Sequence, residues 1–228
     1  MQIHGEHKAS VSEKLFLSLN HLIVVIIVTW LLFGGGFQQV SSVLGMPFEA
    51  GDIARRTLLL IASLVYFVRL IFTGYFMTRK MSWVESITVA IWLYSLHLVF
   101  AFFGGQNHES IGPVAVFGSL LYVTGSYLNT AAEYQRFRWN RRAENNGKLY
   151  TTGLFGYSRH MNYFGDTVLF AGFALITGVW YSLIIPVAMA AMFIFYHIPK
   201  LEAHLREKYP DAFAEYTEKT AQFVPWLF

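Results

Sequence analysis

The sequence predicts an all-α fold: a polytopic integral-membrane bundle of about six helices, with both termini cytoplasmic and an amphipathic helix near the C-terminus. Composition is the first reason. Of the 228 residues, 55% are hydrophobic and only 14% are charged, and the mean hydropathy is +0.42. A soluble domain carries about 25% charged residues, so this chain has too little polar surface to cover itself in water. Long apolar runs and a one-sided distribution of basic residues are the other two reasons.

The apolar runs locate the helices in order along the chain. A transmembrane helix needs about 20 predominantly apolar residues. Four such runs lie at 15–33, 57–77, 84–103 and 111–132. A further stretch, 166–196, is long enough for two helices, and Gly178 to Tyr181 near its middle predict a tight hairpin between them. Pro186 is expected to be tolerated inside the second of these helices.

The basic residues are consistent with this topology. With the N-terminus placed inside, 14 of the 17 Lys and Arg residues fall in cytoplasmic segments, among them Lys8 and Arg79. Only Arg55 and Arg56 fall outside, and Arg69 lies within a span. The positive-inside rule predicts this distribution for an even number of helices with both ends cytoplasmic.

Two cytoplasmic segments, 133–165 and 199–228, are too long and too patterned to be simple turns. The second is predicted to form one amphipathic helix, because its apolar residues recur every three or four positions. These residues are Leu201, Leu205, Tyr209, Phe213 and Tyr216. The aromatic tail 223–228 suits a bilayer interface. We divide the chain into the first three helices at 1–110, the expected substrate side, and the last three with their cytoplasmic segments at 111–228.

Several classes of function are excluded or disfavoured. The chain has no cysteine, which excludes disulfides, iron–sulfur clusters, cysteine–zinc sites and thiol nucleophiles. A net charge of +3 does not suggest nucleic-acid binding. The sequence contains no G-x-G-x-x-G fingerprint, no Walker motif and no repeated histidine boxes. We therefore expect no Rossmann domain and no metal site.

Polar residues concentrate around the end of the fourth predicted span. Asn129 and Glu133 are four residues apart and share a helix face. A cluster of basic side chains follows, and guanidinium groups bind anions in a bidentate manner. The cluster consists of Arg136, Arg138, Arg141, Arg142, Lys148 and Arg159. It suits an anionic ligand, or alternatively the headgroups of anionic lipids. The nearby amides and carboxylates favour a protein-lined site, because such groups are costly in the bilayer.

The stretch 147–166, G-K-L-Y-T-T-G-L-F-G-Y-S-R-H-M-N-Y-F-G-D, resembles a signature of the steroid 5-alpha-reductase-like family, which includes the DUF1295 proteins. This family is related to the sterol C14 reductases, and a wider superfamily includes isoprenylcysteine carboxyl methyltransferases and phospholipid methyltransferases. The resemblance covers about 110 residues, from Gly118 to the end of the chain. Met161 stands where most members have proline.

This resemblance implies an NADPH pocket built by the last three helices and the segments between them. Asn129, Glu133, Arg138 and Arg141 would meet the adenosine-phosphate and ribose groups. Asn162, Tyr163 and Asp166 would meet the nicotinamide end, with His197 closing the pocket, and Arg136 is also predicted to bind the cofactor. Tyr157, Arg159 and His160 belong to the same signature and complete the predicted cofactor-binding set.

Catalysis in such a reductase needs a group that polarises a carbonyl oxygen as negative charge develops. Tyr66 resembles the second-span tyrosine of the steroid reductases, and Arg69 shares its helix face. Ordinary packing in the bundle is the alternative role for Tyr66. The family's partner acid, in a Glu-Leu-Pro motif, is absent, and Glu85 is the candidate in its place. Glu85 could also form a structural pair with Arg69.

The expected activity is therefore an NADPH-dependent reduction of a carbon–carbon double bond in a steroid-like or polyprenoid lipid, with membrane lipids as the other partners. The first alternative is an S-adenosylmethionine-dependent membrane methyltransferase. Such methyltransferases usually carry a Glu-Glu pair at the start of the C-terminal helix, where this chain retains only Glu202. The second alternative is a non-enzymatic scaffold or a transporter.

Overall fold

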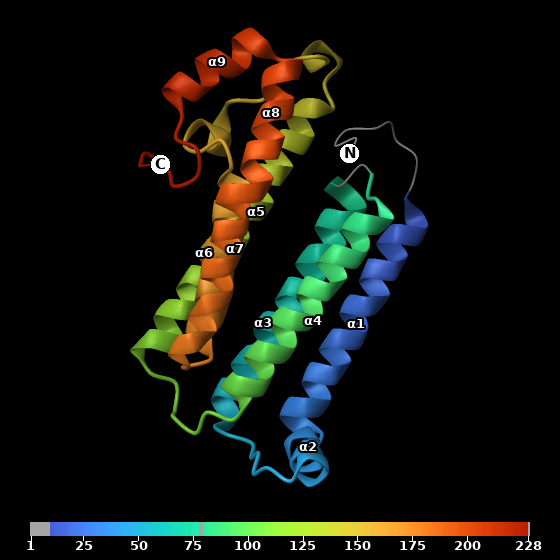
Figure 1. Cartoon of the computed structure of the whole chain (residues 1–228), viewed down its shortest axis with the longest axis vertical. Coiled ribbons are helices and arrows are strands. Elements are labelled where there is room, and N and C mark those ends of the chain that lie inside the picture. Colours follow the sequence, from blue (N-terminus) through green and yellow to red (C-terminus); the bar gives the residue numbers. More distant parts are fainter. Residues whose placement is uncertain (1–9, 78–79, 228) are drawn as a thin grey trace. The chain divides into compact units, whose positions relative to one another are not determined.

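The computed structural model describes residues 10–77 and 80–227, and these residues form helices joined by short loops, with no β-strand among them (Figure 1). An isolated bridge pairs Ser158 with Ala221. The all-α prediction is confirmed. Lys8 and Arg79, which entered the charge distribution above, lie outside the described residues. The chain forms two compact units: 1–119 with 173–182, and 120–172 with 183–228.

The first unit is built around a bundle of α1 (Val11–Phe33), α3 (Ile53–Phe72) and α4 (Trp83–Gly105), each of which packs against the other two. A single π-helical turn, Thr73–Met77, extends α3, and the short helix α2 (Gly36–Leu44) follows α1. Large apolar side chains such as Leu59, Leu93 and Phe100 are almost fully buried between the helices.

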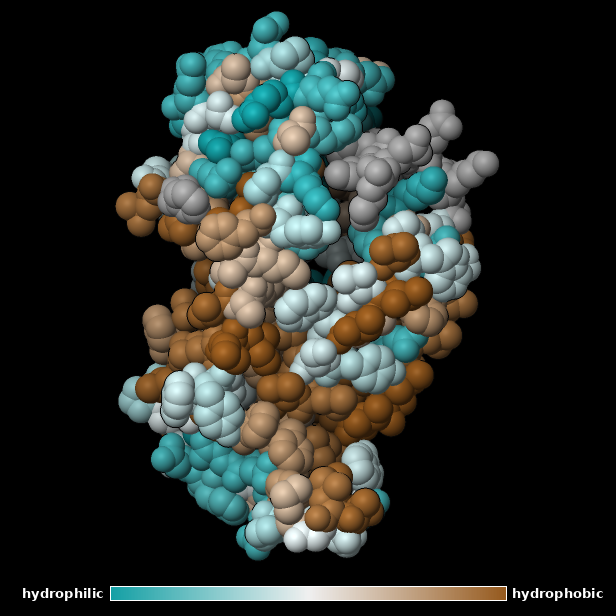
Figure 2. Space-filling model, in the orientation of Figure 1, coloured by the Kyte–Doolittle hydropathy of each residue, from teal (hydrophilic) through white to brown (hydrophobic). Residues whose placement is uncertain are grey.

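The outward faces of these helices are apolar. Ile26, Val68 and Ile91, one from each helix, are each about 60% exposed (58%, 64% and 62%). Figure 2 shows hydrophobic residues gathered along the middle of the helices and hydrophilic ones toward their ends. Helices that are apolar on both their inner and outer faces are typical of a bundle surrounded by lipid.

The second unit contains most of α5 (Pro113–Asn140) and α6 (Met161–Ile176). Its other long helix begins as α7 (Ile184–Met192), passes through a π-helical turn, Phe193–His197, and continues as α8 (Ile198–Lys208). The helix α9 (Pro210–Lys219) precedes the tail. Short 3-10 turns lie at Ala143–Asn145 and Gly153–Gly156 in this unit, and a third, Trp180–Leu183, falls mostly in the first unit.

All six predicted spans are helical, and within the described residues four helices are long and apolar enough to cross a membrane. These are Val11–Phe33, Ile53–Met77, Trp83–Gly105 and Trp180–Lys208. The helix α6 is apolar but has only 16 residues, and α5 ends in a polar, basic turn. The predicted hairpin is present: the chain turns at Gly178, whose φ of +70° is accessible to glycine at little cost. The count of six spans and the cytoplasmic termini stay predictions.

The prediction of one C-terminal amphipathic helix is wrong, because the structure has two. Tyr209 has φ −137° and ψ 60° and separates α8 from α9. The next residue is Pro210, which disfavours helical geometry in the residue before it and suits the first turn of a new helix. In the tail, Phe223 is buried and contacts the Phe164 ring, while Trp226 is exposed. The interfacial position of the tail stays a prediction.

The two basic residues that the topology places outside, Arg55 and Arg56, are both bound to backbone carbonyls. The buried Arg55 donates to the carbonyl oxygens of Ile176, at 2.6 Å, and of Glu109 and Ser110. Arg56 donates to those of Gly51 and of Leu32 in the last turn of α1. The last four carbonyls of a helix have no intrahelical donor, and cations are favourable at that end. These arginines therefore serve as C-terminal caps.

Replacing Arg55 by methionine is expected to lower the free energy of unfolding by about 2–3 kcal/mol, because charge-assisted hydrogen bonds to buried carbonyls are lost. Unfolding in detergent, by heat or by added denaturant, measures the change. Arg142→Met is the matched control: this side chain is 63% exposed, and its change is expected to stay within about 0.5 kcal/mol. Equal effects of the two substitutions would contradict the capping role.

Candidate functional site

Two glycines allow α5 and α6 to cross closely. A Cβ atom added to Gly165 would lie 2.6 Å from the backbone nitrogen of Asn129, and one added to Gly125 would collide with the backbone of Leu169. Small residues at such a crossing let helix backbones approach each other. The close approach sets the end of α5 beside the start of α6, where predicted site residues lie.

A row of hydrogen-bonded polar side chains joins the two helices at this point. The Asn129 amide donates to the backbone carbonyl of Asn162, at 3.0 Å, and the Asn162 amide donates to the Glu133 carboxylate, at 2.9 Å. Arg136 donates to both oxygens of Glu133, at 2.7 and 2.6 Å. We call Asn129, Glu133, Arg136 and Asn162 the polar row. All four were predicted from the sequence, and the structure brings them together.

Two of the predicted arginines beyond the polar row extend into solvent. Arg138 lies over the ring of Tyr134, at 5.8 Å, and Arg141 over the ring of Phe137, at 5.5 Å. Both arginines are exposed. Contacts with aromatic rings hold the side chains without neutralising their charge. These two guanidinium groups therefore remain accessible to an anionic ligand near the end of α5.

The loop before α6 is folded back onto α5. Gly153 has φ +63°, and a Cβ atom there would collide with the side chain of Gln135. The Gln135 side-chain oxygen accepts from the backbone N–H of Leu154, at 2.9 Å, and Phe155 is buried beneath the guanidinium of Arg136. The glycine spacing of the signature thus brings the loop close to the polar row.

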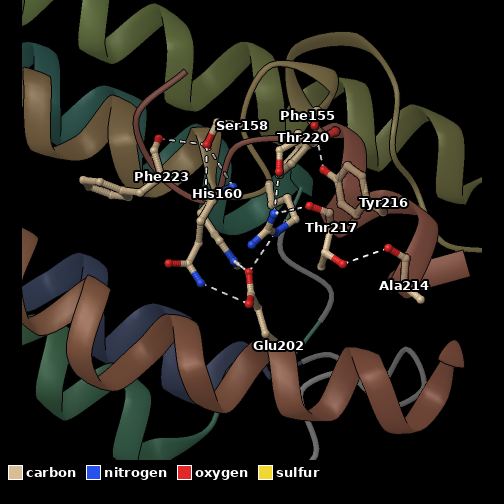
Figure 3. A network of polar contacts seen from close by, with 11 residues as sticks. Phe155, Ser158, His160, Glu202, Ala214, Tyr216, Thr217, Thr220 and Phe223 are labelled. Atoms are coloured by element: carbon tan, nitrogen blue, oxygen red, sulfur yellow. Dashed lines mark hydrogen bonds and ion pairs between the residues drawn. The ribbon is translucent and has the colours of Figure 1, made fainter. Parts of the chain in front are cut away.

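Glu202 on α8 holds the Arg-His pair of the signature (Figure 3). It accepts from Arg159 Nε at 3.0 Å, from His160 Nε2 at 3.0 Å and from Gln222 Nε2 at 3.1 Å. Arg159 also donates to the carbonyl oxygens of Thr217 and Thr220. The Arg159 and Glu202 side chains are each only 10% exposed. We call the contacts of Glu202 with Arg159, His160 and Gln222 the Glu202 clamp.

The clamp fixes the segment before α6 to both α8 and the tail. The Ser158 hydroxyl donates to the carbonyl of Phe223 at 2.8 Å, and the Arg159 N–H donates to that of Ala221 at 2.9 Å. The buried Tyr216 hydroxyl donates to the Phe155 carbonyl at 2.6 Å, and burial raises the pKa of Tyr216. These contacts give Arg159 a structural role, and its predicted contact with a cofactor stays a prediction.

His160 is held in a defined form. Burial lowers the pKa of this imidazole, although the Glu202 carboxylate acts in the opposite direction. Because a carboxylate only accepts hydrogen bonds, Nε2 of the uncharged ring must carry the proton that it donates to Glu202.

Aromatic rings form a stack from the start of α6 to the π-helical turn. The His160 and Tyr163 rings are nearly parallel, with centroids 5.7 Å apart, and Tyr163 stacks on Phe193 at 4.5 Å. His197 lies at the end of the same π-helical turn and contacts the Phe193 ring at 6.0 Å. Single π-helical turns are frequent at functional sites. The predicted residues Tyr163 and His197 are thus brought together, both partly exposed.

The remaining predicted residues have less defined surroundings. Asp166 lies one turn beyond Asn162 on α6 and is partly buried. Tyr157 is exposed, with its ring against that of Trp226 at 5.2 Å. Their roles toward a cofactor stay predictions.

The two predicted catalytic residues lie in the first unit. Tyr66 on α3 is buried at 7% exposure, and the Arg69 guanidinium lies 4.8 Å from its ring centroid, as their shared helix face predicted. Glu85 forms a capping box with Ser82 at the start of α4, in which each side chain bonds the other's backbone N–H. Its described hydrogen bonds are thus those of a helix cap.

Sequence reasoning missed the residues that hold the site together. Glu202 was noted only as the remnant of a methyltransferase motif, and Tyr216 only as part of the apolar repeat of the C-terminal helix. Gln135 and Gln222 were not singled out. A buried guanidinium group needs hydrogen-bond acceptors, and carboxylates or backbone carbonyls can supply them. Spacing alone does not tell that Glu202 is the carboxylate that pairs with Arg159. Among the described residues, no group of three or more His, Asp or Glu side chains is arranged to hold a metal ion.

Because α5 and α6 cross closely, we expect alanine substitutions at two glycines of the chain to change the free energy of unfolding by very different amounts. Gly125→Ala is expected to lower the free energy of unfolding by about 1–3 kcal/mol, because its methyl group has no space between the two backbones. Gly112→Ala, whose Cβ would meet nothing within 4 Å, is expected to change it by less than about 0.5 kcal/mol. Detergent unfolding curves measure both, and a neutral Gly125→Ala would refute the close packing.

The Glu202 clamp predicts strong energetic coupling between Glu202 and Arg159. In a double-mutant cycle with Glu202→Gln and Arg159→Met, we expect each single change to cost about 3 kcal/mol, and the double change less than their sum. The exposed pair Lys219–Glu215 is the control. Although its N···O distance is only 2.5 Å, its coupling is expected to be below about 0.5 kcal/mol, because solvent screens it. Absence of coupling between Glu202 and Arg159 would contradict the clamp.

Comparison with known proteins identifies the family. The family model described as "Protein of unknown function (DUF1295)" matches residues 83–220, which include α4, the polar row and the Glu202 clamp except for Gln222. A search of curated proteins found no match. The match covers more than half of the chain, and the chain therefore belongs to the DUF1295 family.

Proposed function

We propose that this protein is a membrane-embedded, NADPH-dependent reductase of a carbon–carbon double bond in a hydrophobic lipid, a steroid-like enone or a polyprenoid. The observation that carries the proposal is the polar row together with the exposed guanidinium groups of Arg138 and Arg141. The apolar helices of the chain suit a substrate that reaches the protein through lipid.

The residues of the second unit fit the chemistry of NADPH. The Glu133 carboxylate, oriented by Arg136 and Asn162, can accept hydrogen bonds from ribose hydroxyls. Arg138 and Arg141 supply the bidentate donors that phosphate groups require. NADPH, when bound, supplies the hydride for the reduction. The protein's task is then to orient the cofactor, exclude water and place a proton donor.

Tyr66 is the residue that we propose as that proton donor. A buried phenol can donate a hydrogen bond to a carbonyl oxygen, and the Arg69 guanidinium beside the ring stabilises the negative charge that develops as hydride is added. A proton from solvent then adds to the carbon next to the carbonyl group, which completes the reduction of the double bond. Glu85 is the weaker candidate, because its carboxylate takes part in the cap of α4.

A methyltransferase that uses S-adenosylmethionine is the second candidate, favoured by the Arg-His pair and Glu202. Its cofactor carries a positively charged sulfonium, which a carboxylate would stabilise. However, Glu202 already accepts from three side chains, and Arg136 binds both oxygens of Glu133. The excess of positive charge at the end of α5 favours an anionic cofactor, and so supports the reductase.

Cofactor binding to the purified protein in lipid nanodiscs tests the proposal. We expect NADPH to bind, and S-adenosylmethionine not to bind, in calorimetric titrations. The double substitution Arg138→Gln and Arg141→Gln is expected to weaken NADPH binding by about 10- to 100-fold, since charge-assisted hydrogen bonds are lost. NADH binding should change much less, because NADH lacks the additional phosphate.

Glu133→Gln is expected to weaken NADPH and NADH binding alike if Glu133 accepts from the ribose hydroxyls that both cofactors carry, which are those of the nicotinamide ribose and the adenosine 3′-hydroxyl. Lys219→Gln, an exposed substitution on α9, is the control and should leave both affinities unchanged. Binding of S-adenosylmethionine without NADPH would overturn the reductase in favour of the methyltransferase. Binding of neither would favour a scaffold or a transporter.

A further inference from the structure

Two histidines with unpartnered nitrogens are buried inside the three-helix bundle of the first unit. His21 on α1 and His97 on α4 are both 0% exposed, and their ring centroids lie 5.1 Å apart. The Tyr66 ring on α3 lies 5.7 Å from each of them. Each of the three helices of the bundle therefore contributes one polar ring to the same place.

The surroundings of these rings are otherwise apolar. Phe67 packs edge-on against His21 at 5.1 Å, and Phe173 packs against His97 at 5.9 Å. Both nitrogens of His21 and Nε2 of His97 are buried without a hydrogen-bond partner. Leaving a buried polar atom unpartnered is costly, and most such atoms in folded proteins are paired. Unpartnered nitrogens from two different helices at one place indicate a binding site.

The hydrogen bond of His97 determines what it can bind. Its Nδ1 lies 3.0 Å from the backbone carbonyl oxygen of Leu93, and a carbonyl oxygen only accepts. Nδ1 therefore carries the proton, and Nε2 of the uncharged ring presents a lone pair that needs a donor. The uncharged His21 ring offers one N–H donor and one acceptor, and neither is used.

We propose that His21 and His97 bind the hydroxyl group of a hydrophobic alcohol. A hydroxyl can donate to Nε2 of His97 and at the same time accept from the N–H of His21. Hydrogen bonds of about 2.8 Å to a shared oxygen suit rings whose centroids lie this close. A ketone or an ether cannot donate, and so leaves His97 unpartnered.

A metal ion fits the pair less well than a hydroxyl. Metal-bound histidines almost always donate their second N–H to a carbonyl, carboxylate or water. His97 has this arrangement through Leu93, but neither nitrogen of His21 has such a partner. Metal binding is therefore an outcome that the experiment must separate from the proposal.

The hydroxyl site specifies the substrate class of the proposed reductase further, as a lipid that carries an alcohol group in addition to the double bond that is reduced. Only the statement that this alcohol is the reductase's substrate rests on the proposed function, because the hydroxyl site can bind an alcohol without a cofactor. If NADPH does not bind, the reductase proposal is refuted, but the proposal of a hydroxyl site is unaffected. If the alcohol does not bind, the proposal of a hydroxyl site is refuted, but the proposal of an NADPH site is unaffected.

Nitrogen-15 NMR of histidine-labelled protein in phosphatidylcholine nanodiscs tests the site. The probes are 1-hexadecanol and cholesterol, each compared with its methyl ether, which accepts hydrogen bonds but cannot donate one. We expect at least one alcohol to shift the lone-pair nitrogen signal of His97 in the direction of an accepted hydrogen bond. The matching ether should leave the signal unchanged.

Two variants assign the signal and separate binding from folding. His97→Phe keeps the ring shape and removes the unpartnered nitrogen, so we expect unchanged or higher thermal stability without ligand and loss of stabilisation by the alcohol. His108→Gln, in the exposed loop after α4, should retain the full response. The proposal is overturned if neither alcohol shifts the His97 signal, or if ether and alcohol act alike. Stoichiometric binding of zinc or copper that His97→Phe abolishes would overturn it in favour of a metal site.

Discussion

The structure depends on one constraint, which is that polar groups buried away from water must find hydrogen-bond partners within the protein itself. Arg55 meets this constraint by donating to three backbone carbonyls. Arg159 meets it through Glu202 and the carbonyls of two threonines. The chain has few charged residues, and these two buried arginines are both hydrogen-bonded within the protein. His21 and His97 are exceptions, because they have buried nitrogens without a hydrogen-bond partner, and for that reason we propose that they bind a ligand.

The same constraint separates structural from ligand-binding arginines in the second unit. Arg159 and Arg136 are neutralised by Glu202 and Glu133, and they position neighbouring segments. Arg138 and Arg141 contact only aromatic rings in the described interactions and remain in solvent. From the sequence, all of these arginines belonged to one basic cluster. In the structure, the arginines that pair with glutamates support the site, whereas the arginines without a carboxylate partner in the described interactions are available to a ligand.

The sequence predicted much of the fold because apolar length and periodicity are local signals. The helices, the turn at Gly178 and the shared face of Tyr66 and Arg69 follow from such signals. The break at Tyr209 was missed because the apolar spacing continues across Pro210, although proline there disfavours one continuous helix. Partners far apart in the sequence, such as Arg159 and Glu202, depend on tertiary packing, which no local pattern encodes. Asn129, Glu133 and Arg136 were predicted from their clustering in the sequence, and Asn162 through the family resemblance. The close crossing of α5 and α6 that brings them together was not predicted.

Native mass spectrometry of the protein released directly from membranes tests the central claim, that the second unit holds NADPH, most directly. We expect a bound mass equal to that of NADPH or its oxidised form in the unaltered protein, and its loss in the Arg138→Gln, Arg141→Gln variant. A bound mass equal to that of S-adenosylmethionine or its demethylated product would contradict it.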